Sequence, residues 1–386
     1  MIAFFKEKVL SIDLIRIYQH IPVYFIKEKL FDYLYPSCCS SNSCGALLHY
    51  AYIEIMKQLF NIRVYKLKKI HRLIRTSCYS TKVANEKYAL KDNIAELNRL
   101  RIQHNVWSGR CRELYKRGKI CYGDVVLDVG CGPGYNTFEL SEIVGSNGKV
   151  FALDSSLDSL IFLSKRGEQL GWKINKFENK SLSSELKQTV LTHDIVSDIE
   201  LIHANIEEAT PFLSSSTSTT NSEINHIFIR WVLTWVEKPN DALKHLKEVF
   251  GPNGGNIIIW DYFSENTFEL NSEIPTPMFD KLLNVLLMEW KKYGNPSVGK
   301  KLPQLLTQNN FKIESMEPNA PTINAKGPDW IWPTTYFDTQ VKRLNREGVF
   351  TCKEVLDFNN EWNEISDMDT TWYSPPMMVE IIASSN

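Results

Sequence analysis

The chain has 386 residues and a formal net charge of −1 at pH 7, enough length for one large domain or two. The charge is uneven, because residues 1–85 hold 13 Lys and Arg against five Asp and Glu, whereas the remainder holds 31 against 40. An acidic body of this kind is a poor general binder of phosphate backbones, so we expect no nucleic-acid partner. The sequence predicts no particular oligomeric state.

Residues 1–85 form a basic leader. From residue 56 to residue 85 there are eight basic side chains and no acidic one, and the stretch is rich in Ser and Thr near its end. This composition is typical of a mitochondrial transit peptide, which here would run from the internal Met56 to about Lys82. The alternative is a basic amphipathic helix that packs on the body or lies on a membrane surface. We therefore expect a cytoplasmic or mitochondrial protein, with no role assigned to residues 1–55.

The eight cysteines are scattered along the chain, which favours a reducing compartment. The cluster of Cys38, Cys39 and Cys44 with His49 lacks the paired Cys-x-x-Cys spacing of zinc sites, so no metal site is predicted. The chain has no uninterrupted apolar run of the roughly 18 residues that a membrane span needs, so we expect no transmembrane segment.

The body, residues 86–386, alternates helical and strand patterns. Helical spacing of apolar residues is found over 88–106, 136–144, 156–170 and 240–250. Short β-branched or apolar runs predict strands over 125–129, 149–153, 199–203, 226–229, 256–260, 311–316 and 377–383. Such alternation predicts an α/β fold in which a parallel sheet has helices on both faces. Residues 172–191 are polar and carry no assigned element.

A glycine turn follows the first predicted strand. Gly130, Gly132 and Gly134 recur at a spacing of two, which permits positive φ angles and a close approach of a ligand to the backbone. The second strand ends in Asp154, at the position where a carboxylate accepts both hydroxyls of a ribose. Asp128, just before the turn, would repel a pyrophosphate and favour a cationic ligand. A ligand-free turn is the alternative, and the spacing of the acidic residues disfavours it.

The segment Asp-Val-Gly-Cys-Gly-Pro-Gly at 128–134 resembles motif I of the class I S-adenosylmethionine (SAM) dependent methyltransferases. Segments at 154–155, 205–206 and 227–233 follow in the order of that family. The resemblance implies SAM as the cofactor and a Rossmann-like seven-stranded sheet whose last strand is antiparallel. Asn205 would accept a hydrogen bond from the adenine amino group. The cofactor-binding residues that it implies are Asp128, Gly130, Cys131, Gly132, Gly134, Asp154, Ser155, Asn205, Ile206, Arg230, Tyr88 and Gln103.

Two aromatic-rich insertions, at about 264–310 and 320–376, interrupt the second half of the predicted sheet. Pieces of them resemble a bacterial and fungal group of small-molecule methyltransferases whose substrates are mostly unassigned. We expect the insertions to form a cap over the acceptor. Its candidate pocket walls are Trp290, Trp330, Trp332 and Tyr336, although the same rings would serve equally well as a small satellite core.

The resemblance implies methyl transfer to a small-molecule acceptor by in-line displacement. A general base is needed only where the acceptor stays protonated, and Asp261 and Tyr262 are the candidates. The alternative for Asp261 is to orient SAM or a loop. Residues 230–233 read Arg-Trp-Val-Leu, without the Asn-Pro-Pro-Tyr typical of methyltransferases that act on DNA bases. Two other functions remain open: a protein or RNA methyltransferase that docks its substrate through the leader, and a non-catalytic SAM-binding regulator.

Overall fold

The computed structural model describes residues 94–177, 188–208, 224–251 and 253–385. The leader and Tyr88 lie outside these ranges, so the predictions made for them stay predictions. Within the described ranges, no helix is long and apolar enough to cross a bilayer.

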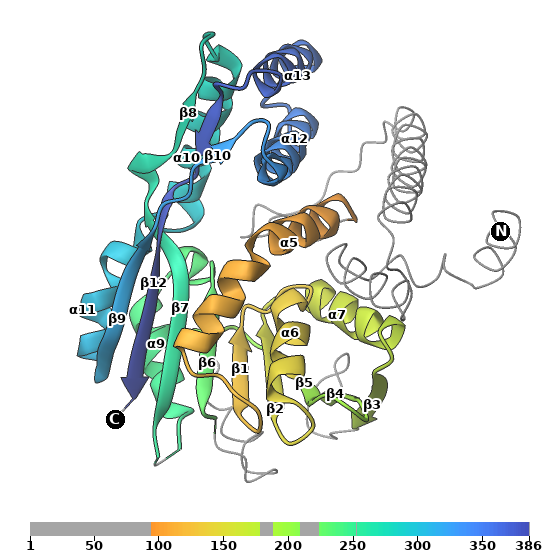
Figure 1. The fold of residues 1–386 in the computed structure, drawn as a ribbon, viewed down its shortest axis with the longest axis vertical. Coiled ribbons are helices and arrows are strands. Elements are labelled where there is room, and N and C mark those ends of the chain that lie inside the picture. Colours follow the sequence, from red (N-terminus) through yellow and green to blue (C-terminus); the bar gives the residue numbers. More distant parts are fainter. Residues whose placement is uncertain (1–93, 178–187, 209–223, 252, 386) are drawn as a thin grey trace, which may run out of the picture. The chain divides into compact units, whose positions relative to one another are not determined.

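A single nine-stranded sheet forms the centre of the described body (Figure 1), in the order β3-β4-β5-β2-β1-β6-β7-β12-β9. The strands are β1 (Val125–Val129), β2 (Lys149–Asp154), β3 (Lys173–Phe177), β4 (Gln188–Thr192), β5 (Asp198–His203), β6 (His226–Arg230), β7 (Gly255–Ser264), β9 (Phe311–Asn319) and β12 (Met377–Ser385). Strands β5, β2, β1, β6 and β7 are parallel neighbours, whereas β12 is antiparallel to β7 and β9. The predicted methyltransferase order, with an antiparallel last strand, is therefore confirmed over seven strands.

Strands β3 and β4 are an addition at the edge of the sheet, where the sequence had shown only a polar stretch. They pair antiparallel with each other, and β4 pairs antiparallel with β5. Their pattern is weak because only one face of an edge strand is covered. The hydrogen bonds to β5, which sequence periodicity does not report, are what make them strands.

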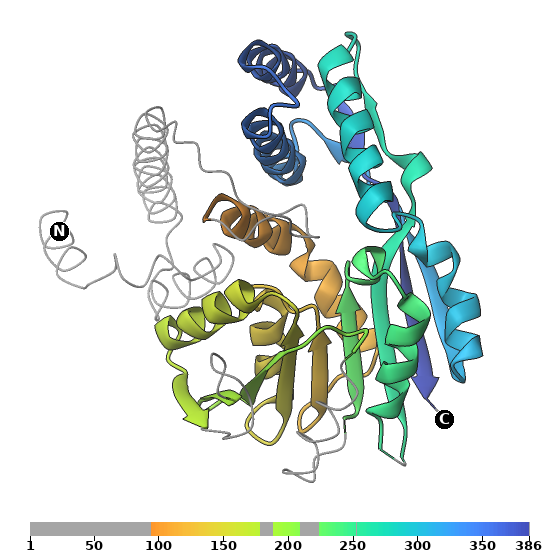
Figure 2. The same ribbon diagram turned by 180° about the vertical axis from the view of Figure 1, so that it is seen from behind.

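Alternate residues of the strands point to opposite faces of the sheet, and a buried core lies on each face. On one face, Val126, Phe228 and Ile258 pack with α5 (Ile94–Arg117), α6 (Tyr135–Val144) and α7 (Leu157–Gln169). On the other, Leu127 and Ile257 pack with α9 (Pro239–Glu248) and α11 (Leu302–Gln308). Figure 1 is viewed from the first face and Figure 2 from the second. Burial on both faces explains the continuous apolar runs of the central strands.

A cap extends beyond the carboxyl edge of the sheet (Figure 1). It consists of α10 (Pro277–Tyr293), α12 (Ile331–Arg346), α13 (Cys352–Ser366) and a small sheet of β10 (Ile323–Asn324), β11 (Trp372–Ser374) and β8 (Glu269–Asn271). Rings such as Phe279, Phe337 and Trp362 pack against one another at centroid distances of 5.1–6.1 Å. The interior of the cap is therefore aromatic, and it is continuous with the buried core on the first face of the sheet.

Helix α5 is longer than the sequence predicted and links the sheet to the cavity described below. The expected helix ended at residue 106, but Cys111, Leu114 and Tyr115 continue its buried face, and the helix ends at Arg117, just before Gly118. Positions four apart lie on the same face of a helix, which is why the burial continues.

Candidate active site

A cavity of about 1280 Å³ opens at the carboxyl ends of β1, β2, β5 and β6, under α5 and the cap. Open α/β sheets bind ligands at this edge. Cavities for single drug-sized ligands measure roughly 300–1,000 Å³, so this one has room for a cofactor and an acceptor together. The predicted site residues that line it are Gln103, Gly130, Cys131, Gly132, Asp154, Ser155, Asn205, Ile206, Arg230, Tyr262, Trp290 and Tyr336.

The backbone amides of the glycine turn are bonded within the protein. The first two amides of the turn donate to the carbonyl of Leu153, over 2.7 and 3.0 Å. Gly132 donates to the Asp154 carboxylate over 2.7 Å, and Gly134 donates to the carbonyl of Cys131 over 3.1 Å. The remaining position is a proline and has no amide hydrogen. Phosphate-binding turns direct such amides at the ligand, so this turn is not built for a pyrophosphate.

The glycines of the turn lack a side chain for two different reasons. Gly130 and Gly134 have φ angles of 65° and 81°, and a Cβ atom would lie 2.3 Å from Val232 or 2.5 Å from Leu163. Gly132 has a φ of 53°, and a Cβ there would meet nothing within 4 Å. Its open side faces the cavity that it lines, where a ligand can approach the backbone. Gly134 lies outside the lining, which contradicts the predicted contact with the cofactor.

Asp154 is held rigidly at the end of β2. Its two carboxylate oxygens accept hydrogen bonds from the amides of Gly132, over 2.7 Å, and Ser156, over 2.8 Å. The carboxylate lines the cavity, and an ionised carboxylate accepts several hydrogen bonds at once, which can include those of two neighbouring hydroxyls. This geometry suits a ribose.

Asn205 follows β5 at the next position along the sheet edge. Its side-chain oxygen accepts from the amide of Glu207 over 3.1 Å, which orients the carboxamide, and one lone pair remains for a ligand. Ile206 beside it is only 5% exposed and lines the same part of the cavity. The pair can therefore provide a polar edge and an apolar surface for a planar heterocycle.

Asp128 does not reach the cavity, contrary to the predicted contact with a cationic cofactor. Its carboxylate is 2% exposed and accepts a hydrogen bond of 2.6 Å from the Thr137 hydroxyl on α6. Burial raises the pKa of Asp128 to about 7, although the bond from Thr137 works in the opposite direction. The residue ties β1 to α6 beneath the glycine turn and acts on the cofactor only through that turn.

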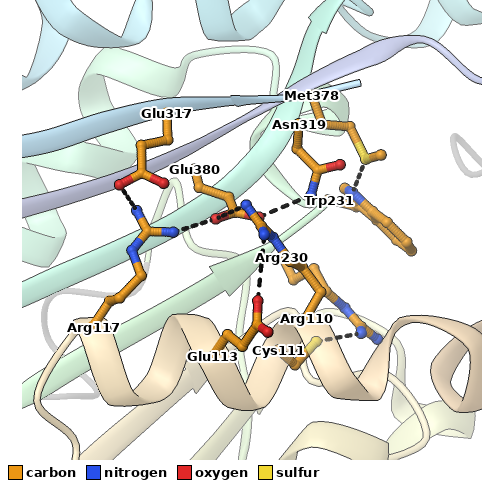
Figure 3. A network of polar contacts seen from close by, with 10 residues as sticks. All are labelled: Arg110, Cys111, Glu113, Arg117, Arg230, Trp231, Glu317, Asn319, Met378 and Glu380. Carbon is orange, nitrogen blue, oxygen red and sulfur yellow. Dashed lines mark hydrogen bonds and ion pairs between the residues drawn. The ribbon is translucent and has the colours of Figure 1, made fainter. Parts of the chain in front are cut away.

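Arg230 brings a positive charge to the cavity at the end of β6. Its guanidinium donates to the Cys111 sulfur over 3.0 Å and lies 5.0 Å from the ring centroid of Trp231. Figure 3 shows the contact with α5. Burial raises the pKa of the Cys111 thiol, so both of these partners are neutral. Arg99, which also lines the cavity, is instead paired with Glu96 over 2.6 Å. Arg230 is therefore the better candidate to bind a carboxylate of a ligand.

The second half of α5 is anchored to the sheet through a buried carboxylate (Figure 3). Glu380 on β12 is 0% exposed and accepts from Arg110 at 2.6 and 3.1 Å and from Arg117 at 2.6 Å. Asn319 on β9 donates to the same carboxylate over 2.9 Å. Because the first half of α5 contributes Gln103 to the cavity, this anchor fixes one wall of the site.

An aromatic wall, consisting of Trp231, Trp235, Tyr262, Trp290 and Tyr336, forms the end of the cavity beyond Arg230. The rings of Trp231 and Tyr262 are nearly parallel, with centroids 6.0 Å apart, and Trp290 lies 5.2 Å from Tyr262 and 5.9 Å from Trp235. Trp231 has a φ of 57°, a conformation that is costly for a bulky residue and is concentrated at functional sites. The sequence placed Trp231 in the cofactor segment at 227–233 but not in the acceptor wall, and it did not select Trp235, which follows β6 by five residues.

Asp261 is a positioning residue, and the prediction of a general base there is wrong. It is 0% exposed and does not line the cavity. Its carboxylate accepts from the amides of Leu233 and Thr234, over 2.8 and 3.4 Å, and from that of Tyr262 over 2.8 Å. Burial raises its pKa to about 7, against the effect of these amides. The alternative in which Asp261 orients a loop is the correct one.

Two of the four predicted pocket walls belong to the cap core instead. Trp330 stacks on Trp362 with centroids 4.9 Å apart and an angle of 8° between the rings. Trp332 is buried and its indole nitrogen donates to Gln103 over 3.2 Å. Neither lines the cavity, whereas Trp290 and Tyr336 do. Trp332 thus lies outside the cavity and supports the α5 wall of the cavity through its hydrogen bond to Gln103.

Residues 122–286 match the family model described as "Methyltransferase domain". The chain contains a class I SAM-dependent methyltransferase domain. This finding agrees with the sheet order and with a turn that offers no amides to a phosphate, and it confirms the predicted superfamily and its cofactor, SAM. Residues 53–170 also match the model described as "Protein-L-isoaspartate(D-aspartate) O-methyltransferase (PCMT)".

Two curated relatives of the methyltransferase domain align over short segments. The 2-phytyl-1,4-beta-naphthoquinone methyltransferase of Arabidopsis thaliana is 41% identical over 75 residues, which is 19% of this chain and 27% of the relative. The probable cobalt-precorrin-6B C(15)-methyltransferase (decarboxylating) of Saccharolobus solfataricus is 38% identical over 53 residues, 14% of this chain and 27% of the relative. The chain thus spans about a quarter of each. A solved structure of a putative methyltransferase from Bacillus halodurans is 16% identical, with a TM-score of 0.41 over 71% of this chain and 97% of that one.

Proposed function

We propose that the protein transfers the methyl group of SAM to a small-molecule acceptor. The observation that carries this proposal is the order of side chains along one cavity. Strands β5, β2, β6 and β7 are arranged so that Asn205, Asp154, Arg230 and Tyr262 follow one another along the sheet edge. These positions suit, in turn, an adenine, a ribose, an amino-acid carboxylate and an acceptor.

The side chains of this protein would bind and orient the cofactor and the acceptor, and they would exclude water from the site. When bound, SAM supplies a methyl group that is already activated for displacement. Asp154 would hold the ribose hydroxyls, and Arg230 would hold the carboxylate of the methionine part. The aromatic wall would place an acceptor in line with the methyl group and keep water out, which are the main contributions that such a displacement needs.

The lining of the acceptor end by side chains from three separate helices favours a small molecule over a macromolecule. Trp290 on α10, Tyr336 on α12 and Arg99 on α5 line the cavity, and the Arg99 guanidinium lies 5.6 Å from the ring centroid of Tyr336. The match to the protein-L-isoaspartate methyltransferase model ends at residue 170, within the cofactor half, so it includes no residue of the aromatic wall. The Arabidopsis relative is named for a naphthoquinone, which agrees with an aromatic pocket.

A labelling experiment tests the proposal. The protein is incubated with a cell extract and with SAM that carries tritium in its methyl group, and the low-mass, protein and RNA fractions are counted. We expect label in low-mass compounds other than SAM, and none in such compounds with Asp154→Ala. Label confined to protein or RNA would contradict a small-molecule acceptor, and bound SAM without transfer to any fraction would indicate a regulator.

We also propose that the segment from residue 56 to about residue 82 directs the protein to mitochondria. The proposal is supported by composition alone, since the segment is basic, rich in hydroxyl groups and free of acidic residues. Microscopy of a C-terminally tagged chain, started at Met1 or at Met56, tests it. A diffuse cytoplasmic signal from both tagged chains would contradict it.

A further inference from the structure

We infer that the acceptor is a planar, weakly acidic hydroxy-aromatic molecule that reacts as its oxygen anion and takes no base from the protein. The inference rests on the proposed function and specifies its substrate class. It follows from three features of the acceptor end: flat walls, positive charge, and the position of the acidic side chains.

The walls suit a flat ring. Within the aromatic wall, Trp231 and Tyr262 are within 17° of parallel, and Trp290 is inclined by 44° to Tyr262. Large rigid rings provide apolar contact area at a small cost in conformational entropy, and they stack preferentially on other rings. A planar aromatic acceptor uses these surfaces better than a branched aliphatic one does.

The charges that line the acceptor end are positive. The exposed lysines Lys292 and Lys301 line the cavity at the end of α10 and the start of α11, whereas the charge of Arg230 is assigned to the carboxylate of the cofactor. Lys292 also lies 4.9 Å from the ring centroid of Tyr293, another lining residue. These cations disfavour a cationic acceptor, even though aromatic rings alone would attract one. They stabilise an anion and lower the pKa of an acidic hydroxyl bound beside them.

Among the described residues, all but one of the acidic and imidazole side chains that line the cavity lie at or just after the ends of β2 and β5, at its cofactor end. These residues are Asp154, Asp158, His203 and Glu207. The exception is Glu237, which lies between Trp235 and Lys238, and the Lys238 amide donates to Glu207.

The Tyr336 phenol of the aromatic wall does not replace them as a base. Burial raises the pKa of the Tyr336 hydroxyl above its usual range, so the group stays protonated. The lining thus favours an acceptor that ionises by its own acidity.

The transfer step balances without a proton donor or acceptor. A lone pair of the acceptor oxygen forms the O–CH₃ bond as the S–CH₃ bond breaks, and the bonding pair stays on sulfur. The oxygen anion becomes a neutral ether and the sulfonium becomes a neutral thioether. Opposite charges thus disappear in the transition state, a change that a site with little water favours.

Binding of matched probes in the presence of saturating S-adenosylhomocysteine (SAH) tests the inference by calorimetry. The probes are 4-nitrophenol, its neutral methyl ether, and the trimethylammonium salt with the same nitrophenyl ring. We expect the nitrophenolate to bind at least tenfold more tightly than the cation. A second phenol of different acidity should shift the pH midpoint of binding with its own pKa. Tighter binding of the cation, or one midpoint shared by both phenols, would overturn the inference.

Variants separate the contributions of ring and charge. The double change Lys292→Gln and Lys301→Gln should weaken binding of the nitrophenolate about threefold to tenfold and leave binding of the ether unchanged. Lys353→Gln, an exposed position on α13 outside the lining, is the matched control. Trp290→Ala should weaken binding of both the nitrophenolate and the ether. Failure of SAH itself to bind would refute the proposed function, whereas normal SAH binding without preference for the anion refutes only this inference.

Discussion

Removal of the Asp154 carboxylate should weaken binding of SAH by about 100-fold or more. In the structure this group is fixed by the amides of Gly132 and Ser156 and lines the cavity, where it would accept from both hydroxyls of the ribose. Hydrogen bonds to a charged group contribute about 1.5–3 kcal/mol each, so the loss of two corresponds to at least about 3 kcal/mol. Each 1.4 kcal/mol is a factor of ten in the dissociation constant. Asp154→Asn keeps one acceptor oxygen, so its affinity for SAH should fall about tenfold.

Calorimetric titration with SAH measures these changes. Asp198→Asn is the matched control, because that aspartate is exposed at the opposite end of the neighbouring strand β5. It should bind as the wild type does. The reasoning about the ribose site is refuted if Asp154→Ala, shown by circular dichroism to be folded, binds SAH within threefold of the wild type.

Three further substitutions test separate parts of the site. Arg230→Gln should weaken SAH about tenfold but leave adenosine, which has no carboxylate, unaffected in the same titration; an equal loss for both would assign Arg230 to the fold alone. Glu380→Gln should lower the free energy of unfolding in urea by about 2–3 kcal/mol, because Arg110 and Arg117 lose their shared buried partner but remain partly exposed; no change would show that α5 is held by packing. Since the pKa of Asp128 is raised to about 7 in the folded state, its stabilising contribution is complete at low pH and is lost as the pH rises towards 7. From pH 5 to pH 8 the wild type should therefore lose up to about 2.7 kcal/mol relative to Asp128→Asn in urea unfolding, and parallel profiles would contradict the raised pKa.

The cofactor half of the cavity could be predicted from the sequence because it depends on local features. A glycine turn after a buried strand, and a carboxylate at the end of the next strand, are positioned by β1 and β2 and little else. Asp154 and Asn205 therefore line the cavity as expected. The order of the central strands follows equally from the alternation of strands and helices.

The acceptor half could not be predicted to the same extent, since it depends on contacts between distant segments. At the end of β7, Asp261 turns towards three backbone amides and Tyr262 towards the cavity, and no sequence pattern distinguishes the two. Trp330 and Trp290 look alike in sequence, and Trp330 is assigned to the core of the cap only by its stacking on Trp362 of α13. The place of Trp231 in the aromatic wall was not predicted, because it depends on the contact with Tyr262 and on a positive φ angle that are visible only in the structure.

A crystal structure of the protein with SAH bound tests the central claim most directly. The account predicts the ribose hydroxyls at the Asp154 carboxylate, the adenine beside Asn205 and Ile206, and the sulfur directed at the aromatic wall. An adenine at the aromatic wall, or SAH bound outside this cavity, would contradict it.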